Sequence, residues 1–147
     1  MSHTASIKAT KIQSISALRA AVQELNERHG IKCSLLERAK PRAYFADQAG
    51  MGLAPYVLHL ADCKYDIGFY EDPKGGYEAR TDFWSGHVEK VLGVEACSIT
   101  GREQAKLGKM FQAYGIHAAM EQARKQGYSV RRQAGKDGAE QLVITGV

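Results

Sequence analysis

Polar and aromatic side chains gather on one face of a three-stranded meander that the sequence predicts over residues 56–83. This face carries Asp66, Tyr70, Glu78, Arg80 and Asp82, with Trp84 just beyond the last strand. Neighbours on adjacent strands stand about 5 Å apart, so these groups can converge. Gly68 lies between Asp66 and Tyr70, and a glycine within a strand permits close approach of a ligand or another backbone. Carboxylates beside tyrosine and tryptophan suit a protein partner, or a cationic or ring-bearing small molecule. The alternative is a solvated face of ion pairs.

A second polar feature lies on a predicted long helix near the C-terminus. Tyr114 and His117 are three residues apart and therefore share a helix face. They form either a polar opening at the seam between helix and sheet, or a core tyrosine beside a boundary histidine. The predicted ligand- or partner-binding residues are therefore Asp66, Tyr70, Arg80, Asp82, Trp84, Tyr114 and His117.

Basic and aromatic residues interleave where this helix gives way to a predicted hairpin. The residues are Arg124, Lys125, Tyr128, Arg131 and Arg132. Proteins that bind single-stranded nucleic acid use such residues, with cations against phosphates and rings against bases. About four or five phosphate contacts would give weak, salt-sensitive binding.

Recognisable catalytic and metal-binding motifs are missing. The sequence has no Cys-x-x-Cys, His-x-His or His-Glu-x-x-His pattern, no Gly-x-Ser-x-Gly and no phosphate-binding loop of the Gly-x-x-x-x-Gly-Lys type. Cys63, His87 or His117, and Asp66 can be grouped on paper as a nucleophilic site, but nothing in their spacing supports it. We therefore predict no catalytic residue, metal or cofactor, and an enzyme is the least favoured class.

The composition is that of one globular domain spanning residues 1–147. The longest run without a polar side chain, residues 49–58, is about half the length of a membrane-spanning helix. The three cysteines are an odd number and lie far apart, which favours a reducing cytoplasm. We expect no membrane association, and the sequence leaves the oligomeric state open.

Charge changes sign along the chain. Residues 1–50 and residues 101–147 each hold eight basic and four acidic side chains, whereas residues 51–100 hold four and eight. Either the acidic middle faces a basic surface within the fold or in a second copy, or the two ends form a cationic face for a polyanion.

The periodicity predicts an α+β fold with a mainly antiparallel sheet, and with one N-terminal and one long C-terminal helix packed on one face. Strands are expected at residues 5–11, 31–36, 56–60, 65–71 and 77–83, and a terminal hairpin at residues 128–132 and 140–145. Ser14 and Gly30 should bound the first helix. The second helix should begin with the Thr100–Glu103 capping box, bury Leu107, Met110, Phe111, Tyr114 and Ala118, and stop at Gly127. Residues 37–55 and 84–100 show no clear element, apart from one or two helical turns over residues 88–94.

Several short segments resemble a family of hypothetical reading frames of unknown function, found in cyanobacteria and red-algal plastids, with relatives in bacteriophages. The matching pieces are residues 1–3 with Ile7 and Lys8, the Tyr-Asp-Ile-Gly-Phe run at 65–69, residues 76–79 with Asp82 and Trp84, Tyr114, and residues 126–130, 137–138 and 142–144. The tail is closer to the phage relatives. The expected location is the cytoplasm, which is that of the host if the protein is phage-encoded. The family has no established catalytic residues to carry over.

These observations together favour a non-enzymatic binding or regulatory protein that contacts a protein partner or sequesters a small ligand. The alternative is a weak, salt-sensitive nucleic-acid-binding protein. A small enzyme of unrecognised type comes third.

Overall fold

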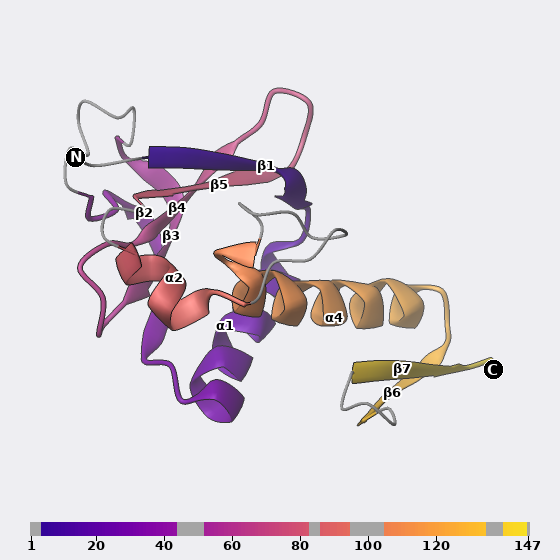
Figure 1. Cartoon of the computed structure of the whole chain (residues 1–147). Helices are drawn as coiled ribbons and strands as arrows, with labels where there is room; N and C mark the ends of the chain where they lie inside the picture. The colour runs from indigo at the N-terminus through magenta and orange to yellow at the C-terminus, as the bar shows by residue number, and fades with distance from the viewer. Residues whose placement is uncertain (1–3, 44–51, 83–85, 95–104, 135–139, 147) are drawn as a thin grey trace.

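A five-stranded antiparallel sheet, three helices and a separate hairpin form the described part of the chain (Figure 1). The computed structural model describes residues 4–43, 52–82, 86–94, 105–134 and 140–146. The sheet has the order β1-β5-β4-β3-β2, and each neighbouring pair is antiparallel. The elements are β1 (Thr4–Ile12), α1 (Ile15–His29), β2 (Cys33–Ala39), β3 (Ala54–Leu60), β4 (Ile67–Glu71), β5 (Tyr77–Asp82), α2 (His87–Leu92), α4 (Gly108–Lys125), β6 (Ser129–Ala134) and β7 (Glu140–Thr145). The predicted α+β class with a mainly antiparallel sheet is confirmed.

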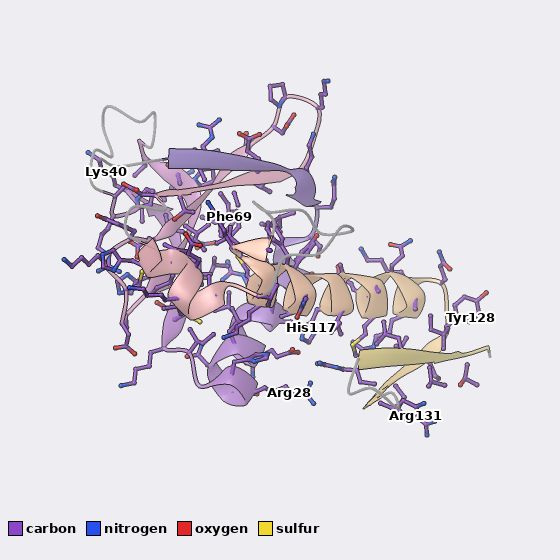
Figure 2. The ribbon with its side chains drawn as sticks, in the orientation of Figure 1. Arg28, Lys40, Phe69, His117, Tyr128 and Arg131 are labelled. Carbon is purple, nitrogen blue, oxygen red and sulfur yellow. The ribbon has the colours of Figure 1, made fainter. Side chains whose placement is uncertain are left out.

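The main core lies between the sheet and the helices. From the sheet it contains Leu58, Ile67, Phe69 and Ala79, which come from three adjacent strands. From the helices it contains Leu18, Ala21 and Leu25 of α1, Leu92 of α2, and Leu107, Met110, Phe111 and Tyr114 at the start of α4. Figure 2 shows Phe69 pointing from the sheet toward the helices.

Helix α1 has the ends that the sequence predicted. The Ser14 side chain accepts a hydrogen bond from the Ala17 N–H at 3.1 Å, which satisfies one of the unpaired donors of the first turn. Gly30 ends the helix in the left-handed conformation, with φ of 64°.

Helix α4 begins later than the sequence predicted. Its first residue is Gly108, because the chain turns at Leu107, whose backbone is not helical. Thr100 and Glu103 lie outside the described residues. A Cβ on Gly108 would lie 2.2 Å from a methyl carbon of Val94, so the glycine allows Val94 to pack against the helix. A Cβ on Gly115 would have no neighbouring atom within 4 Å, so this second glycine of α4 faces open space.

The β6–β7 hairpin lies at the far end of α4, away from the large sheet (Figure 1). It contacts α4 through both strands. Met120 and Ala123, on the second half of α4, are buried but do not belong to the main core. A two-stranded sheet is marginally stable by itself, so the hairpin depends on this contact with α4.

Candidate functional site

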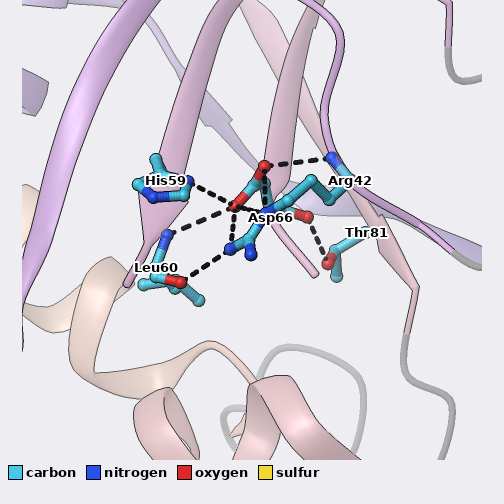
Figure 3. Close-up of polar contacts among 5 residues, drawn as sticks. All are labelled: Arg42, His59, Leu60, Asp66 and Thr81. Atoms are coloured by element: carbon cyan, nitrogen blue, oxygen red, sulfur yellow. Dashed lines mark hydrogen bonds and ion pairs between the residues drawn. The ribbon is translucent and has the colours of Figure 1, made fainter. Parts of the chain in front are cut away.

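Asp66 is the centre of a buried polar cluster that ties a crossing segment to the sheet (Figure 3). We call residues 40–43, which follow β2 and contact Gly68 and Asp66, the strap. The Arg42 N–H donates to Asp66 Oδ2 at 3.0 Å, and Arg42 Nη2 donates to Oδ1 at 2.8 Å. Arg42 Nη2 also donates to the Leu60 carbonyl at 2.7 Å. His59 Nδ1 lies 3.0 Å from Asp66 Oδ1.

The backbone around Asp66 completes this cluster. The Asp66 N–H donates to the Arg42 carbonyl at 2.9 Å, and the Thr81 hydroxyl donates to the Asp66 carbonyl at 2.8 Å. Burial raises the pKa of Asp66, but the hydrogen bonds from Arg42 outweigh burial, and the pKa lies below its ordinary value. The same hydrogen bonds raise the pKa of Arg42. The carboxylate is therefore ionised and already saturated with donors from its own chain.

The rest of the predicted meander face is also largely occupied from within. A Cβ on Gly68 would lie 2.6 Å from the Tyr70 ring and 3.1 Å from Pro41, so these two side chains fill the space that we had assigned to a ligand. Asp82 is fully buried. The Arg80 guanidinium lies 4.8 Å from the centre of the half-buried Tyr70 ring. Trp84 lies outside the described residues.

The histidine at Asp66 is one that the sequence analysis did not select. His59, not His87 or His117, contacts the carboxylate. His87 packs edge-on against Tyr65, with ring centres 5.6 Å apart, and His117 contacts Glu24. Within the described ranges, no group of three or more His, Cys, Asp or Glu side chains is arranged to hold a metal ion.

Tyr114 is a buried residue whose hydroxyl group accepts hydrogen bonds from the backbone just before α1. Its hydroxyl oxygen accepts hydrogen bonds from the N–H groups of Gln13 at 2.8 Å and Ser14 at 3.1 Å. Tyr114 is 5% exposed, so it offers no surface to a partner. Of the two alternatives for Tyr114, a core tyrosine therefore agrees with the structure better than a polar opening between helix and sheet.

We expect Tyr114→Phe to lower the free energy of unfolding by about 1–2 kcal/mol, because two partly buried N–H groups, those of Gln13 and Ser14, lose their acceptor. Urea denaturation measures this change. The matched control is Tyr128→Phe, which removes a hydroxyl from an exposed ring and should change stability by less than about 0.5 kcal/mol. Equal effects from the two substitutions would mean that the Tyr114 hydroxyl is not structural.

His117 and Arg132 meet at the carboxylate of Glu24, although the sequence analysis placed them in different candidate sites. His117 Nε2 lies 2.9 Å from Glu24 Oε1, and Arg132 Nη1 contacts the same oxygen. Arg132 Nη2 lies 3.3 Å from Oε2. Burial raises the pKa of Glu24, but the hydrogen bonds from Arg132 and His117 lower it more, and the pKa lies below its ordinary value. This Glu24 cluster connects α1, α4 and β6.

A groove of about 430 Å³ runs between α1 and α4 beside the Glu24 cluster. It is lined by Ser16, Ala17, Ala20, His117, Glu121, Arg124 and Lys125. The Glu121 carboxylate accepts hydrogen bonds from Ser14 Oγ at 2.9 Å and from Ser16 Oγ at 2.8 Å. Lys125 Nζ lies 3.5 Å from the same carboxylate. Arg124 and Lys125, which line the groove, are both exposed to solvent.

Tyr128 and Arg131 are exposed at the hairpin. Tyr128 is 42% exposed, at the corner between α4 and β6. Arg131 and Arg132 are consecutive strand residues and so point to opposite faces. Arg132 turns toward Glu24, and Figure 2 shows Arg131 pointing away from α4. The structure therefore separates these two arginines, which the sequence analysis had grouped together.

Comparison with known proteins assigns a family. A family model described as "Protein of unknown function (DUF1257)" matches residues 46–143, about two thirds of the chain. The chain belongs to this family. The predicted resemblance to an uncharacterised family is thus confirmed. No curated protein and no solved structure matches the chain.

The segment that matches DUF1257 holds only part of each polar cluster. Asp66, His117 and Arg132 lie inside it, whereas their partners Arg42 and Glu24 precede it.

In the described ranges, no helix combines the length and apolar character that a membrane crossing requires.

Proposed function

We propose that this protein is a non-enzymatic binding protein that contacts the backbone of single-stranded nucleic acid through its basic corner. The basic corner consists of Arg124, Lys125, Tyr128 and Arg131. The observation that carries this proposal is that all four side chains are exposed, whereas Asp66, Asp82 and Tyr114 of the competing site are buried within the fold.

The charge of the C-terminal elements supports a polyanionic ligand. Residues 105–134 and 140–146 contain six Lys or Arg and two acidic residues. Three of the six cations, Arg124, Lys125 and Arg131, belong to the basic corner, whereas Lys106 and Lys109 lie at the other end of α4 and Arg132 binds Glu24. Cations at an exposed corner attract phosphates over about one Debye length.

The groove between α1 and α4 offers a path for the phosphate backbone. Arg124 and Lys125 line it, and Tyr128 follows at the end of the helix. An exposed tyrosine ring stacks on a base without sequence preference. Arg132 takes no part in this proposal, because its guanidinium binds Glu24.

A protein-partner function through the meander face has less support. Among the predicted binding residues of this face that the structure describes, Tyr70 and Arg80 are half-buried and stack on each other, whereas Asp66 and Asp82 are buried. Phage origin and cytoplasmic location remain predictions from the sequence.

Fluorescence anisotropy with a labelled single-stranded 12-mer tests the proposal. With about three phosphate contacts, affinity should fall roughly 20-fold between about 50 and 200 mM salt. Arg124→Glu with Lys125→Glu should weaken binding at least about 10-fold and flatten the salt dependence.

The matched control reverses two exposed lysines that lie outside the basic corner, Lys32→Glu with Lys64→Glu. It makes the same change in net charge and should reduce affinity by no more than about 3-fold. If both double variants weaken binding equally, the interaction depends on net charge alone and the basic corner is not the site.

A further inference from the structure

A second pocket, of different chemistry, lies at the end of the large sheet where β2 ends, β3 begins, and β4 turns into β5. Its volume is about 350 Å³. We call it the rim pocket, and it is lined by Glu37, Arg38, Pro55, Tyr56, Glu71 and Tyr77. None of these residues belongs to the basic corner or to the meander face described above.

Two tyrosine rings form a corner in the rim pocket. The ring centres of Tyr56 and Tyr77 are 5.5 Å apart and the ring planes meet at 84°. Burial, together with the neighbouring Tyr56 and Glu71, raises the pKa of Tyr77, so its phenol stays neutral. Neutral phenol rings attract organic cations to their faces.

Strand pairing places a carboxylate beside each ring. Glu37 pairs with Tyr56 between β2 and β3, and Glu71 pairs with Tyr77 between β4 and β5. Paired residues share a face of the sheet. The lining thus holds two carboxylates, those of Glu37 and Glu71, and one guanidinium, that of Arg38.

The chain's own Arg19 shows which cation fits this chemistry. Its guanidinium carbon lies 5.9 Å from the centre of the Tyr56 ring, and its Nη2 donates to Glu37 Oε1 at 2.8 Å. One half of the arrangement, Tyr56 with Glu37, therefore already holds a guanidinium. The other half, Tyr77 with Glu71, has the same two components, and the Glu71 side chain is exposed.

We propose that the rim pocket binds the guanidinium group of an arginine-like ligand, between the Tyr77 ring and the Glu71 carboxylate. A planar guanidinium stacks on a ring and donates two parallel hydrogen bonds to a carboxylate, which an ammonium group does not do. This binding is independent of the basic corner, so either proposal can fail without the other.

An NMR titration of the ¹⁵N-labelled full chain tests the inference, with N-acetylarginine amide as the probe. We expect saturable shifts at Glu71 and Tyr77 with a dissociation constant of about 1 mM, and several-fold weaker binding of N-acetyllysine amide. A capped five-residue peptide with a central arginine forms the second arm. Tighter binding of the peptide identifies a protein arginine as the source, and equal binding identifies a free small molecule.

Three variants are expected to change the affinity for the arginine probe in different ways. Glu71→Gln should weaken binding at least about 5-fold, because the guanidinium loses its charged acceptor. Arg19→Ala should strengthen it about 3-fold, because it frees Glu37 and the Tyr56 ring for the ligand. Glu27→Gln, an exposed acidic residue on α1, is the matched control and should have no effect.

The inference is overturned if the probe causes no shifts at about 20 mM, well above the expected dissociation constant. It is also overturned if Glu27→Gln weakens binding as much as Glu71→Gln, or if Arg19→Ala weakens it. The variants change exposed side chains, and an amide spectrum without ligand that differs from the native one only near the substitution will verify that each one is folded.

Discussion

Asp66→Asn should lower the free energy of unfolding by about 2–3 kcal/mol. The substitution keeps the size of the side chain but removes the charge that faces Arg42 and His59. It also replaces one acceptor oxygen by an amide donor, although the N–H groups of Arg42 and Leu60 need an acceptor. The Arg42 side chain is 42% exposed and can recover some hydration, so the loss should be smaller than the roughly 3–5 kcal/mol typical of breaking a fully buried pair.

The pH dependence of stability gives a second readout of Asp66. Its pKa is lower in the folded chain than its ordinary value of 3.8. The folded state therefore binds fewer protons, and Asp66 contributes stability above the unfolded pKa that is lost as pH falls through the folded pKa. Urea denaturation between about pH 3 and pH 7 should show this loss in the native chain, and a smaller one in Asp66→Asn.

Asp62→Asn is the control for this experiment, since Asp62 is an exposed residue of the same β3–β4 connection. It should change stability by less than about 0.5 kcal/mol. A native-like stability and pH profile for Asp66→Asn would show that the strap is held by something other than the Asp66 carboxylate.

Glu24→Gln should release the hairpin from the helices. Glu24 is 8% exposed, and it joins His117 of α4 to Arg132 of β6. A glutamine offers one acceptor oxygen and directs N–H donors at a guanidinium that needs an acceptor. We expect a local loss of about 2 kcal/mol, which is roughly a 30-fold loss of hydrogen-exchange protection in β6 and β7. Protection in β3 and β4 should change little.

Lowering the pH should have the same effect on the native chain. The pKa of Glu24 lies below its ordinary value of 4.5, so its stabilising contribution is complete above that value and is lost as pH falls through the folded pKa. Protection relative to intrinsic exchange rates should therefore decrease in the hairpin under acidic conditions. Glu27→Gln, one turn further along α1 and exposed, should leave the hairpin unchanged. Uniform loss of protection across sheet and hairpin would contradict a local role for Glu24.

Local signals in the sequence predicted the elements well. Ser14 and Gly30 bound α1, because capping and left-handed turns depend on a few neighbouring residues. The apolar spacing from Leu107 to Ala118 found the buried face of α4. The sequence did not predict the turn at Leu107 that precedes α4, and the predicted capping box of Thr100 and Glu103 lies outside the described residues.

The candidate site was harder to predict, because its interactions are long-range. Arg42 and Asp66 are 24 residues apart, and Glu24 and Arg132 are 108 apart. One signal was present: Glu24 falls among the buried residues Ala21, Val22 and Leu25, where a charge requires a partner. For Arg42 the only signal was its place in a cluster of basic residues. Polar residues selected for binding therefore include several that hold the fold together.

Chemical-shift mapping tests the proposed function most directly. A ¹⁵N-labelled sample of the full chain is titrated with an unlabelled single-stranded 12-mer at low salt. Shifts concentrated at Ser16, Arg124, Lys125, Tyr128 and Arg131, and reversed by added salt, are the expected result. Shifts confined to the large sheet, or no shifts at all under these conditions, would contradict the assignment of the basic corner as a nucleic-acid-binding surface.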